Sequence, residues 1–194
     1  THTIAPNWLY SDQEGYLINA ADGTLTVNRK AVTLSASKVY DGTTSLTGGV
    51  SVGGLIGSET LTYTGATASD SHVATANKFI NAITLADGSN GGLASNYQLP
   101  TLNVANAPVT ITTKGLTAVL NNTGVTKVYD GNTNAPSGFT PSYTFTGLVA
   151  GDTSAGIGNT GMIYDSKDVL SASKVTVSGL TLSSITGTNS SAVS

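Results

Sequence analysis

The chain has 194 residues, among them 31 Thr, 22 Ser and 23 Gly, and only 10% of its residues are charged. A formal net charge of −3 argues against a phosphate-binding surface, which needs clustered Lys and Arg, so no nucleic-acid partner is expected. There is no Cys to form a disulfide, and no apolar run approaches the roughly 18 residues of a membrane-spanning helix, so membrane insertion is not expected either.

Residues 1–29 are expected to contain the tail of a preceding module. Gly15 to Ile18 and Asp22 to Val27 predict two short strands, because apolar residues of high strand propensity follow turn-forming Gly and Asp. Residues 1–14, which include Trp8, carry no assignable pattern. On this interpretation the chain starts inside a unit of a longer protein.

Residues 30–113 form the first predicted module. From Val32 to Ser37 apolar residues alternate with Thr and Ser, the period of two that a strand with one buried face requires. A strand is also expected from Leu102 to Ile111, and Tyr97 follows a tight bend, as in the tyrosine corner that anchors a Greek-key crossover. The predicted turns are Asp41-Gly42, Asp87-Gly88 and Asn90-Gly91-Gly92.

Residues 114–194 form the second predicted module. Alternating patterns predict strands from Leu116 to Leu120 and from Val175 to Ser178. The first module continues through a closing strand-like segment, whereas the second reaches Ser194 before any such segment. We therefore expect the second module to be truncated and to expose an unpaired edge.

Two glycine-containing segments of the second module leave other structures open. Gly151 to Ala155 permits one helical turn capped by an Asp or Thr side chain, which keeps a β-grasp-like module with one short helix as the alternative architecture. Gly156 to Gly161 fits the G-x-G-x-x-G phosphate pattern, but no long apolar strand precedes it and no helix is predicted after it. This segment is expected to be a loop that links strands.

An identical five-residue block occurs in both modules. Lys38 to Gly42 returns as Lys127 to Gly131, 89 positions later. Leu25-Thr26-Val27 matches Val109-Thr110-Ile111 at an offset of 84, so the second copy carries five extra residues, which we place at Val119 to Gly124 as a longer loop. This self-similarity predicts an all-β fold of tandem antiparallel β-sandwich, Ig-like modules.

Downstream of the block the two copies continue to match. Gly54 pairs with Gly147 at an offset of 93, and farther along Asp70 falls near Asp165 and Lys78 near Lys174. The drift in offset predicts small differences in loop length between two copies of one design.

The repeated block is predicted to be a structural motif. Its Asp accepts hydrogen bonds from nearby backbone N–H groups, its Gly takes the positive φ that follows, and its Tyr supplies an apolar ring with a hydroxyl to anchor. The alternative is that both tyrosines, displayed along a rod, offer stacking faces to sugars or to a partner protein. The predicted motif residues are Lys38, Tyr40, Asp41, Gly42, Lys127, Tyr129, Asp130 and Gly131.

The lysines of the two blocks allow two interpretations. Lys38 and Lys127 are expected to extend their amines from a strand into solvent. The alternative is an intramolecular cross-link between the Lys amine and an Asn or Asp side chain, assisted by a neighbouring acid. An intact mass that shows no loss of ammonia or water excludes the cross-link.

No catalytic, cofactor or metal site is predicted. His2 and His72 lie in no metal-binding or nucleophile motif, and a hydrolase built on Glu14 and Glu59, the only glutamates, would not suit a repeated chain. No Asp-rich loop of the EF-hand kind is present to hold Ca²⁺. The carboxylates considered for such an ion are Asp165, Asp168, Asp70 and Asp152. We expect the chain not to be an enzyme.

The motifs resemble a known family of repeats. With Lys-Val-Tyr-Asp-Gly at 38–42 and 127–131, Gly-Leu-Ile at 54–56 and Ser-Asn-Tyr-Gln-Leu at 95–99, the chain resembles the YDG repeat family. Asp22 to Val27 is similar to the last strand of the related bacterial MBG repeats. Such repeats occur in very large surface proteins similar to filamentous haemagglutinin, which Gram-negative bacteria export by two-partner secretion as adhesins and biofilm matrix proteins.

The resemblance implies a mechanical role outside the cell. We expect the modules to form a stalk or spacer of a secreted adhesin or biofilm matrix protein at the bacterial cell surface, with neighbouring modules of the same chain as partners. The alternative is a multivalent module that binds glycans or extracellular matrix through many weak contacts. The family supplies no catalytic residues for this chain.

Overall fold

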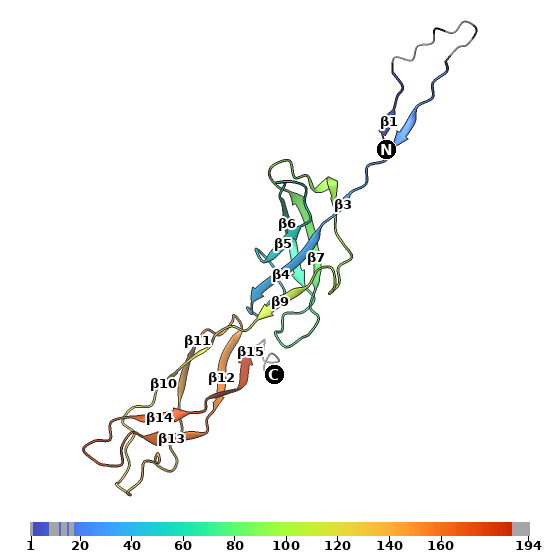
Figure 1. Ribbon diagram of the computed structural model, residues 1–194. Helices are drawn as coiled ribbons and strands as arrows, with labels where there is room; N and C mark the ends of the chain where they lie inside the picture. Colours follow the sequence, from blue (N-terminus) through green and yellow to red (C-terminus); the bar gives the residue numbers. More distant parts are fainter. Residues whose placement is uncertain (1, 8–11, 13–14, 16–17, 188–194) are drawn as a thin grey trace.

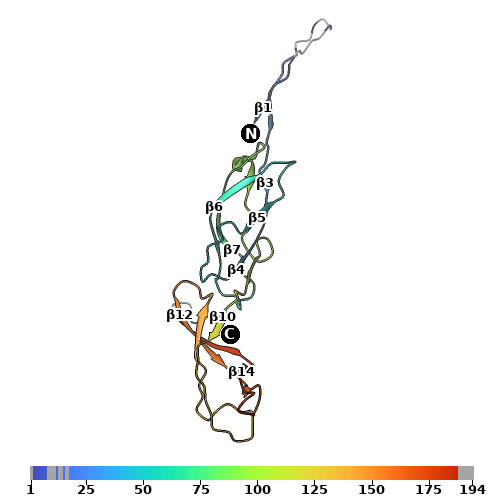
Figure 2. The same ribbon diagram turned by 90° about the vertical axis from the view of Figure 1, so that its left-hand side faces the viewer.

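The computed structural model describes residues 2–7, 12, 15 and 18–187. The chain is mostly β, as predicted, and the described residues contain no α-helix. Figures 1 and 2 show three parts that follow one another along a single long axis: an N-terminal hairpin, a first module and a second module. No helix among the described residues is long and apolar enough to span a bilayer.

The N-terminal hairpin is formed by β1 (His2–Ile4) and β2 (Gly23–Leu25), which pair antiparallel. All residues of both strands are exposed, so neither strand covers a core. The strand predicted from Gly15 to Ile18, like Trp8, falls wholly or partly outside the described residues.

The first module contains seven strands and one 3₁₀ turn, η1 (Ala94–Asn96). The strands are β3 (Lys30–Ala31), β4 (Thr33–Val39), β5 (Val50–Gly53), β6 (Leu61–Ala68), β7 (Ile80–Asp87), β8 (Tyr97–Gln98) and β9 (Val109–Thr112). They form a three-stranded sheet in the order β5-β4-β9, an antiparallel pair β6-β7 and a short parallel pair β3-β8. The predicted alternation in β4 is confirmed, because Leu34 and Ala36 are buried between exposed Thr and Ser.

The core of the first module lies between these sheets. Ile80 and Leu46 are fully buried, and the inward residues of β4 and β9 pack in the same cluster. The strand predicted from Leu102 to Ile111 is shorter than expected and starts at Val109, because Asn103 accepts the Asn106 and Ala107 N–H groups and so forms a turn.

Strand β9 closes the first module by joining its two sheets. On one side it pairs in parallel with the second half of β4, in a register that sets Ala36 beside Val109. On the other side the N–H of Val109 donates to the Lys78 carbonyl at 3.0 Å, and the N–H of Ile80, in β7, donates to the Ala107 carbonyl at 2.9 Å. Most strand pairs are antiparallel, as predicted, whereas β4 and β9, like the short pair β3 and β8, run in the same direction.

The described residues of the second module form six strands in three antiparallel pairs. The strands are β10 (Thr117–Leu120), β11 (Tyr143–Thr146), β12 (Asp152–Gly158), β13 (Gly161–Tyr164), β14 (Val175–Ser178) and β15 (Thr181–Gly187). The pairs are β10-β11, β12-β15 and β13-β14. Together, the pairs β12-β15 and β13-β14 correspond to the single long hairpin that β6 and β7 form in the first module.

Both modules make the same contact between hairpins. The Leu46 N–H donates to the Ala66 carbonyl at 2.9 Å, and the Ala135 N–H donates to the Met162 carbonyl at 3.1 Å. The first pair has the large side chain at the donor residue, whereas the second has it at the acceptor residue. The repeat inferred from the sequence thus has the same backbone contacts in three dimensions.

Farther along, Asp165 takes the place of Ser69. The Phe79 N–H donates to Ser69 Oγ at 3.1 Å, and the Lys174 N–H donates to Asp165 Oδ1 at 3.2 Å. The sequence matches in this region, which set Asp165 near Asp70, are therefore displaced by one residue.

The helical turn permitted from Gly151 to Ala155 is wrong. Asp152 begins β12, which pairs with β15 from Gly187 back to Thr181. The Gly156 to Gly161 segment contains the end of β12, a two-residue link and the start of β13, so it links strands as expected. A cap residue starts a helix only where no neighbouring strand takes the backbone N–H and C=O groups.

The five extra residues of the second module do not form a simple loop. The offset between the copies rises from 84 to 89 before the block and to 93 after it, so the returning chain also gains four residues. These two insertions lie side by side: the Asn121 N–H donates to the Ser142 carbonyl at 2.8 Å, and Asn122 Oδ1 accepts the Ser142 N–H at 2.6 Å. The insertion lengthens a hairpin.

The two modules are joined by residues 113–116, because β9 ends at Thr112 and β10 begins at Thr117. β9 therefore completes the core of the first module and leads directly into the second. The second module is less enclosed, and Val149 is its one buried apolar residue among those described.

Candidate functional site: the two lysine sites

The repeated block lies where β4 ends and the chain turns back toward β5. Gly42 takes a φ of 79° and Gly131 a φ of 76°, which only Gly adopts readily. Asp41 Oδ1 accepts the Thr43 N–H at 2.9 Å, and Asp130 Oδ1 accepts the Asn132 N–H at 3.1 Å. The roles that the sequence predicts for Asp and Gly in the block match this geometry.

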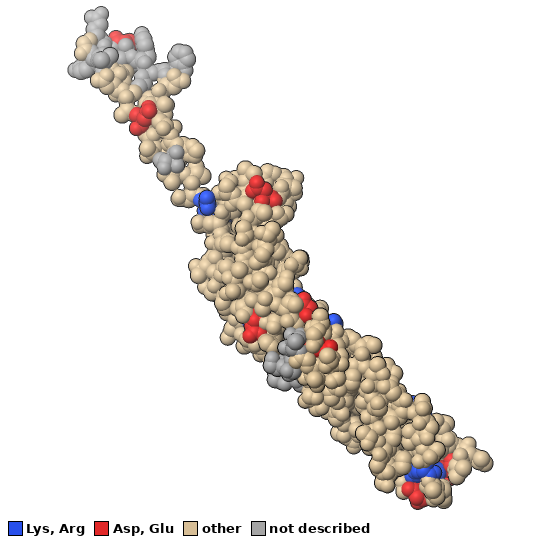
Figure 3. Space-filling view, turned by 180° about the vertical axis from the view of Figure 1, so that it is seen from behind, with Lys and Arg blue, Asp and Glu red and all other residues tan. Residues whose placement is uncertain are grey.

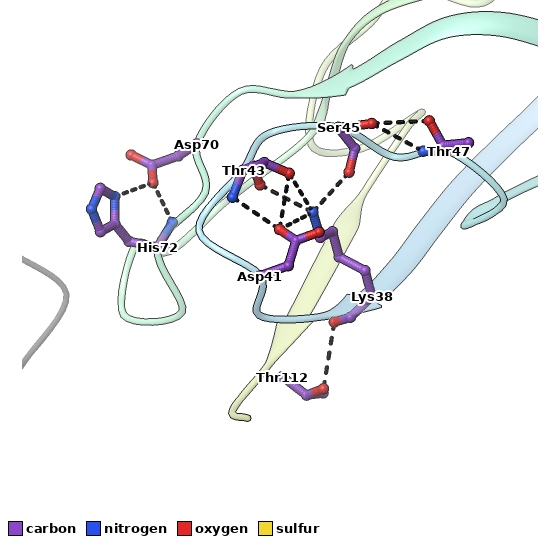
Figure 4. A network of polar contacts seen from close by, with 8 residues as sticks. All are labelled: Lys38, Asp41, Thr43, Ser45, Thr47, Asp70, His72 and Thr112. Carbon is purple, nitrogen blue, oxygen red and sulfur yellow. Dashed lines mark hydrogen bonds and ion pairs between the residues drawn. The ribbon is translucent and has the colours of Figure 1, made fainter. Parts of the chain in front are cut away.

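Lys38 closes this turn with its ammonium group. Its Nζ donates to Asp41 Oδ1 at 2.6 Å, to the Ser45 carbonyl at 2.8 Å and to the Thr43 carbonyl at 3.0 Å. Figure 4 shows that the contacts come from successive residues of one loop that wraps around the amine. We call Lys38 with these three acceptors the first lysine site.

Lys127 forms the second lysine site in the same way. Its Nζ lies 2.8 Å from Asp130 Oδ1 and donates to the Asn132 carbonyl at 3.0 Å and to the Asn134 carbonyl at 2.8 Å. Asn132 adds its side-chain oxygen at 3.1 Å, where Thr43 Oγ1 contacts Lys38 at 3.2 Å in the first site. The two sites are equivalent contact by contact.

The lysine amines do not extend into solvent, so that expectation is wrong. The side chains of Lys38 and Lys127 are only 11% and 13% exposed, whereas those of Asp41 and Asp130 are about half exposed. The loop carbonyl groups hold each amine, and no strand pattern in the sequence reveals that the loop returns over the lysine.

Both lysine sites stabilise the ionised form of their Asp side chain. Burial alone would raise the pKa of Asp41, but the hydrogen bonds from Lys38 and Thr43 and the charge of Lys38 lower it below its ordinary value. The hydrogen bond from Lys127 likewise lowers the pKa of Asp130.

The two block tyrosines differ in burial. Tyr40 is half-buried against the core of the first module, and its N–H donates to the Thr112 carbonyl of β9 at 2.9 Å. Burial and the charges of Asp152 and Asp41 raise the pKa of its hydroxyl. Tyr129 is 57% exposed. The anchoring role therefore fits Tyr40, whereas Tyr129 has an accessible ring.

Tyr97 is the most completely buried tyrosine among the residues that the structure describes. It is 3% exposed, its hydroxyl donates to Glu59 Oε2, and that hydroxyl accepts the Ile56 N–H at 3.0 Å. The hydrogen bond to Glu59 raises the pKa of Tyr97. A tyrosine after the η1 bend thus anchors the loop before β6, as a tyrosine corner does. No pattern in the sequence indicates that Glu59 is its partner.

His72, Asp70 and Asp165, which were also considered for chemistry, have local structural partners. His72 Nδ1 lies 2.7 Å from Asp70 Oδ1, within one turn. Asp165 accepts the Ser173 N–H at 3.0 Å and the Ser173 hydroxyl at 2.6 Å, which lower its pKa to about 2. Among the described residues no three His, Asp or Glu side chains converge in a way that could hold a metal ion.

A buried lysine was not anticipated from the sequence. Lys78 is 7% exposed, and its amine donates to the Val73 carbonyl at 3.0 Å and to the Thr75 carbonyl. The contact fastens the loop between β6 and β7 to the start of β7. Figure 3 shows that charged side chains are few and scattered on the face it presents, apart from a small mixed group at one tip.

Comparison with known proteins identifies the repeat. The model of the YDG domain family matches residues 21–105 and 109–191. No curated protein and no solved structure matches the chain. The first span begins four residues before Leu25-Thr26-Val27, and the second begins at the first residue of β9. By sequence β9 therefore belongs to the second repeat, although it completes the core of the first module. The chain belongs to the YDG domain family, of which it contains two tandem copies.

Proposed function

We propose that these two domains form part of a stalk or spacer in a large secreted protein of the bacterial surface, an adhesin or a biofilm matrix protein. The observation that carries the proposal is the continuity of the chain between modules. β9 is hydrogen-bonded on both sides within the first module, and only residues 113–116 separate it from β10. A linker this short, fixed at one end in a sheet, limits bending between modules.

The chemistry of the surface and the motifs supports a mechanical role. The two lysine sites use every charged group of the repeated block to hold a loop of their own module. The Thr- and Ser-rich composition keeps an extended surface polar with few charges. In this proposal the modules hold a distance and catalyse no reaction.

Small-angle scattering of the full chain tests the spacer. We expect the profile of a rod that stays extended at low and high salt. A matched variant with eight Gly and Ser residues inserted after Gly115 should give a broader distribution of distances, because the flexible insert frees the second module. A native chain that is as flexible as the insertion variant would contradict the proposal.

One observation favours a second function, the binding of glycans or matrix. Tyr129 exposes more than half of its surface, and an accessible aromatic ring can stack on a sugar. A glycan array with the native chain, Tyr129→Ala and the neighbouring Val128→Ala separates the two functions. Binding that is lost only in the tyrosine variant supports a binding module, and absence of binding to any glycan leaves the spacer.

A further inference from the structure

The second module has an open edge where the first module has β9. Residues 36–39 of β4 lie beside β9, and the equivalent residues by the repeated block are 125–128. Within the part of the chain that the structure describes, no strand pairs with 125–128. Val128 and Tyr129 are therefore largely exposed at this edge.

The segment of the second module that would flank an inserted strand on its other side is also partly exposed. In the first module β9 and the residue before it contact the start of β7 through Phe79 and Ile80. The equivalent residues are Lys174 and Val175, because Lys174 takes the place of Phe79 beside Asp165. Ile80 is fully buried, whereas Val175 remains partly exposed. We call the space between 125–128 and 173–175 the closing slot.

The N-terminal part of the chain contains a segment whose sequence resembles that of β9, the strand that fills the equivalent position in the first module. Leu25-Thr26-Val27 aligns with Val109-Thr110-Ile111 of β9 at an offset of 84. Val109 and Ile111 are 7% and 5% exposed in the first module, but Leu25 and Val27 are 48% and 71% exposed. The N-terminal segment thus has the apolar alternation of a closing strand without a core to cover.

We propose that the closing slot of one chain binds the segment from Gly23 to Asn28 of a second copy. In the register of β4 and β9, Leu25 lies beside Val125, Thr26 beside Thr126 and Val27 beside Lys127. On the other side, the backbone of residues 23–25 pairs antiparallel with residues 173–175, as Ala107 and Val109 do with β7. Docking exchanges the exposed β1-β2 ladder for this pairing.

The geometry makes the association intermolecular and head-to-tail. β1 and β2 lie at one end of the long axis, whereas β13 and β14 lie at the other (Figure 1). The segment from Gly23 to Asn28 cannot reach the slot of its own chain, so the contact joins two copies through different surfaces. The Val125 carbonyl accepts the Tyr164 hydroxyl at 3.2 Å and retains a second lone pair for the incoming strand.

The position of the closing strand within the sequence repeat also supports the segment from Gly23 to Asn28 as the one that binds the closing slot. The second family match starts at the first residue of β9, and β9 closes the module of the first match. The first match starts before Leu25 to Val27. A strand at the start of each repeat is therefore suited to close another module, and the inference does not depend on the proposed spacer function.

Cysteine cross-linking of the full chain tests the register. The native sequence has no Cys, so Thr26→Cys with Thr126→Cys introduces the only pair. Adjacent in-register Cα atoms lie about 5 Å apart, within disulfide range, whereas Thr24→Cys with Thr126→Cys is two residues out of register and beyond it. We expect a ladder of disulfide-linked oligomers from the first pair only, which a reductant collapses.

Sedimentation of the chain without cysteines tests the apolar contact. We expect association that rises with concentration, falls at least tenfold in Val27→Glu and persists in Thr26→Glu, because Thr26 faces outward as Thr110 does. A synthetic peptide of residues 105–113 should compete. Absence of a ladder, a ladder of equal yield from both cysteine pairs, or equal association of both Glu variants would overturn the proposal.

Discussion

Replacing Lys38 by Met tests which contacts give the lysine site its stability. The three N–H groups of the ammonium are matched by three close acceptors: Asp41 Oδ1 at 2.6 Å, Ser45 O at 2.8 Å and Thr43 O at 3.0 Å. Met keeps the apolar stem that fills the space under the loop but removes every donor. The variant therefore separates hydrogen bonding from packing.

The two carbonyl groups should account for most of the loss. A hydrogen bond to a charged donor contributes about 1.5–3 kcal/mol when buried, and water recovers part of this at exposed residues such as Thr43 and Ser45, which leaves about 1 kcal/mol for each. Asp41 is 52% exposed, so its ion pair adds less than about 1 kcal/mol. We expect Lys38→Met to cost about 2–3 kcal/mol and Asp41→Asn about 0.5–1 kcal/mol.

Residue-resolved amide hydrogen exchange in the full chain measures this difference. The informative amides are those of Leu46 and Ala68, which donate to the Ala66 and Thr44 carbonyls at 2.9 and 2.8 Å and so join the loop to β6. The Ala135 amide in the second module is the internal control and should not change. Equal losses in the two variants, or a loss below about 0.5 kcal/mol in Lys38→Met, would refute the reasoning.

Three further predictions concern other parts of the chain. Tyr143→Phe should stabilise the second module by about 1 kcal/mol in amide exchange, because the Tyr143 hydroxyl is buried without a partner among the described residues; a destabilised variant would contradict this. Gly92→Ala should cost about 1–3 kcal/mol, since its Cβ would lie 1.9 Å from the Thr60 carbonyl oxygen, while Gly115→Ala, which meets open space, should be close to neutral in the same thermal melts. The pKa of Asp165 is lowered to about 2 in the folded chain, so its contribution is complete above about pH 4 and disappears as the pH falls through 2; melts between pH 5 and pH 2 should show a smaller decline in Asp165→Asn, and an equal decline would contradict the assignment.

The repeat could be predicted from the sequence because it depends on local rules. A period of two identifies one buried face of a strand, which is why the segment that contains Leu34 and Ala36 forms β4. Asp41 and Gly42 specify their turn through a side-chain hydrogen bond two residues away and a positive φ, so the copy at Asp130 forms the same turn. The predicted module boundaries at residues 30 and 114 stay predictions.

Contacts between distant residues decided what the sequence left open or misassigned. Asp152 has the side chain of a helix cap, yet it begins a strand because Gly187, 35 residues later, pairs with it. The amine of Lys38 turns inward because the loop that follows supplies two carbonyl groups above it.

β9 shows most clearly which properties local sequence determines and which depend on the tertiary structure. Its alternating Val109 and Ile111 fix that it is a strand with one apolar face, and this much is a property of four consecutive residues. Which core that face covers depends on β4 and β7, about 70 and 30 residues earlier, whose edges it joins. Local sequence determines the conformation of such a segment, but only the tertiary structure determines its partner, because backbone hydrogen bonds and apolar burial act between any residues that the fold brings together.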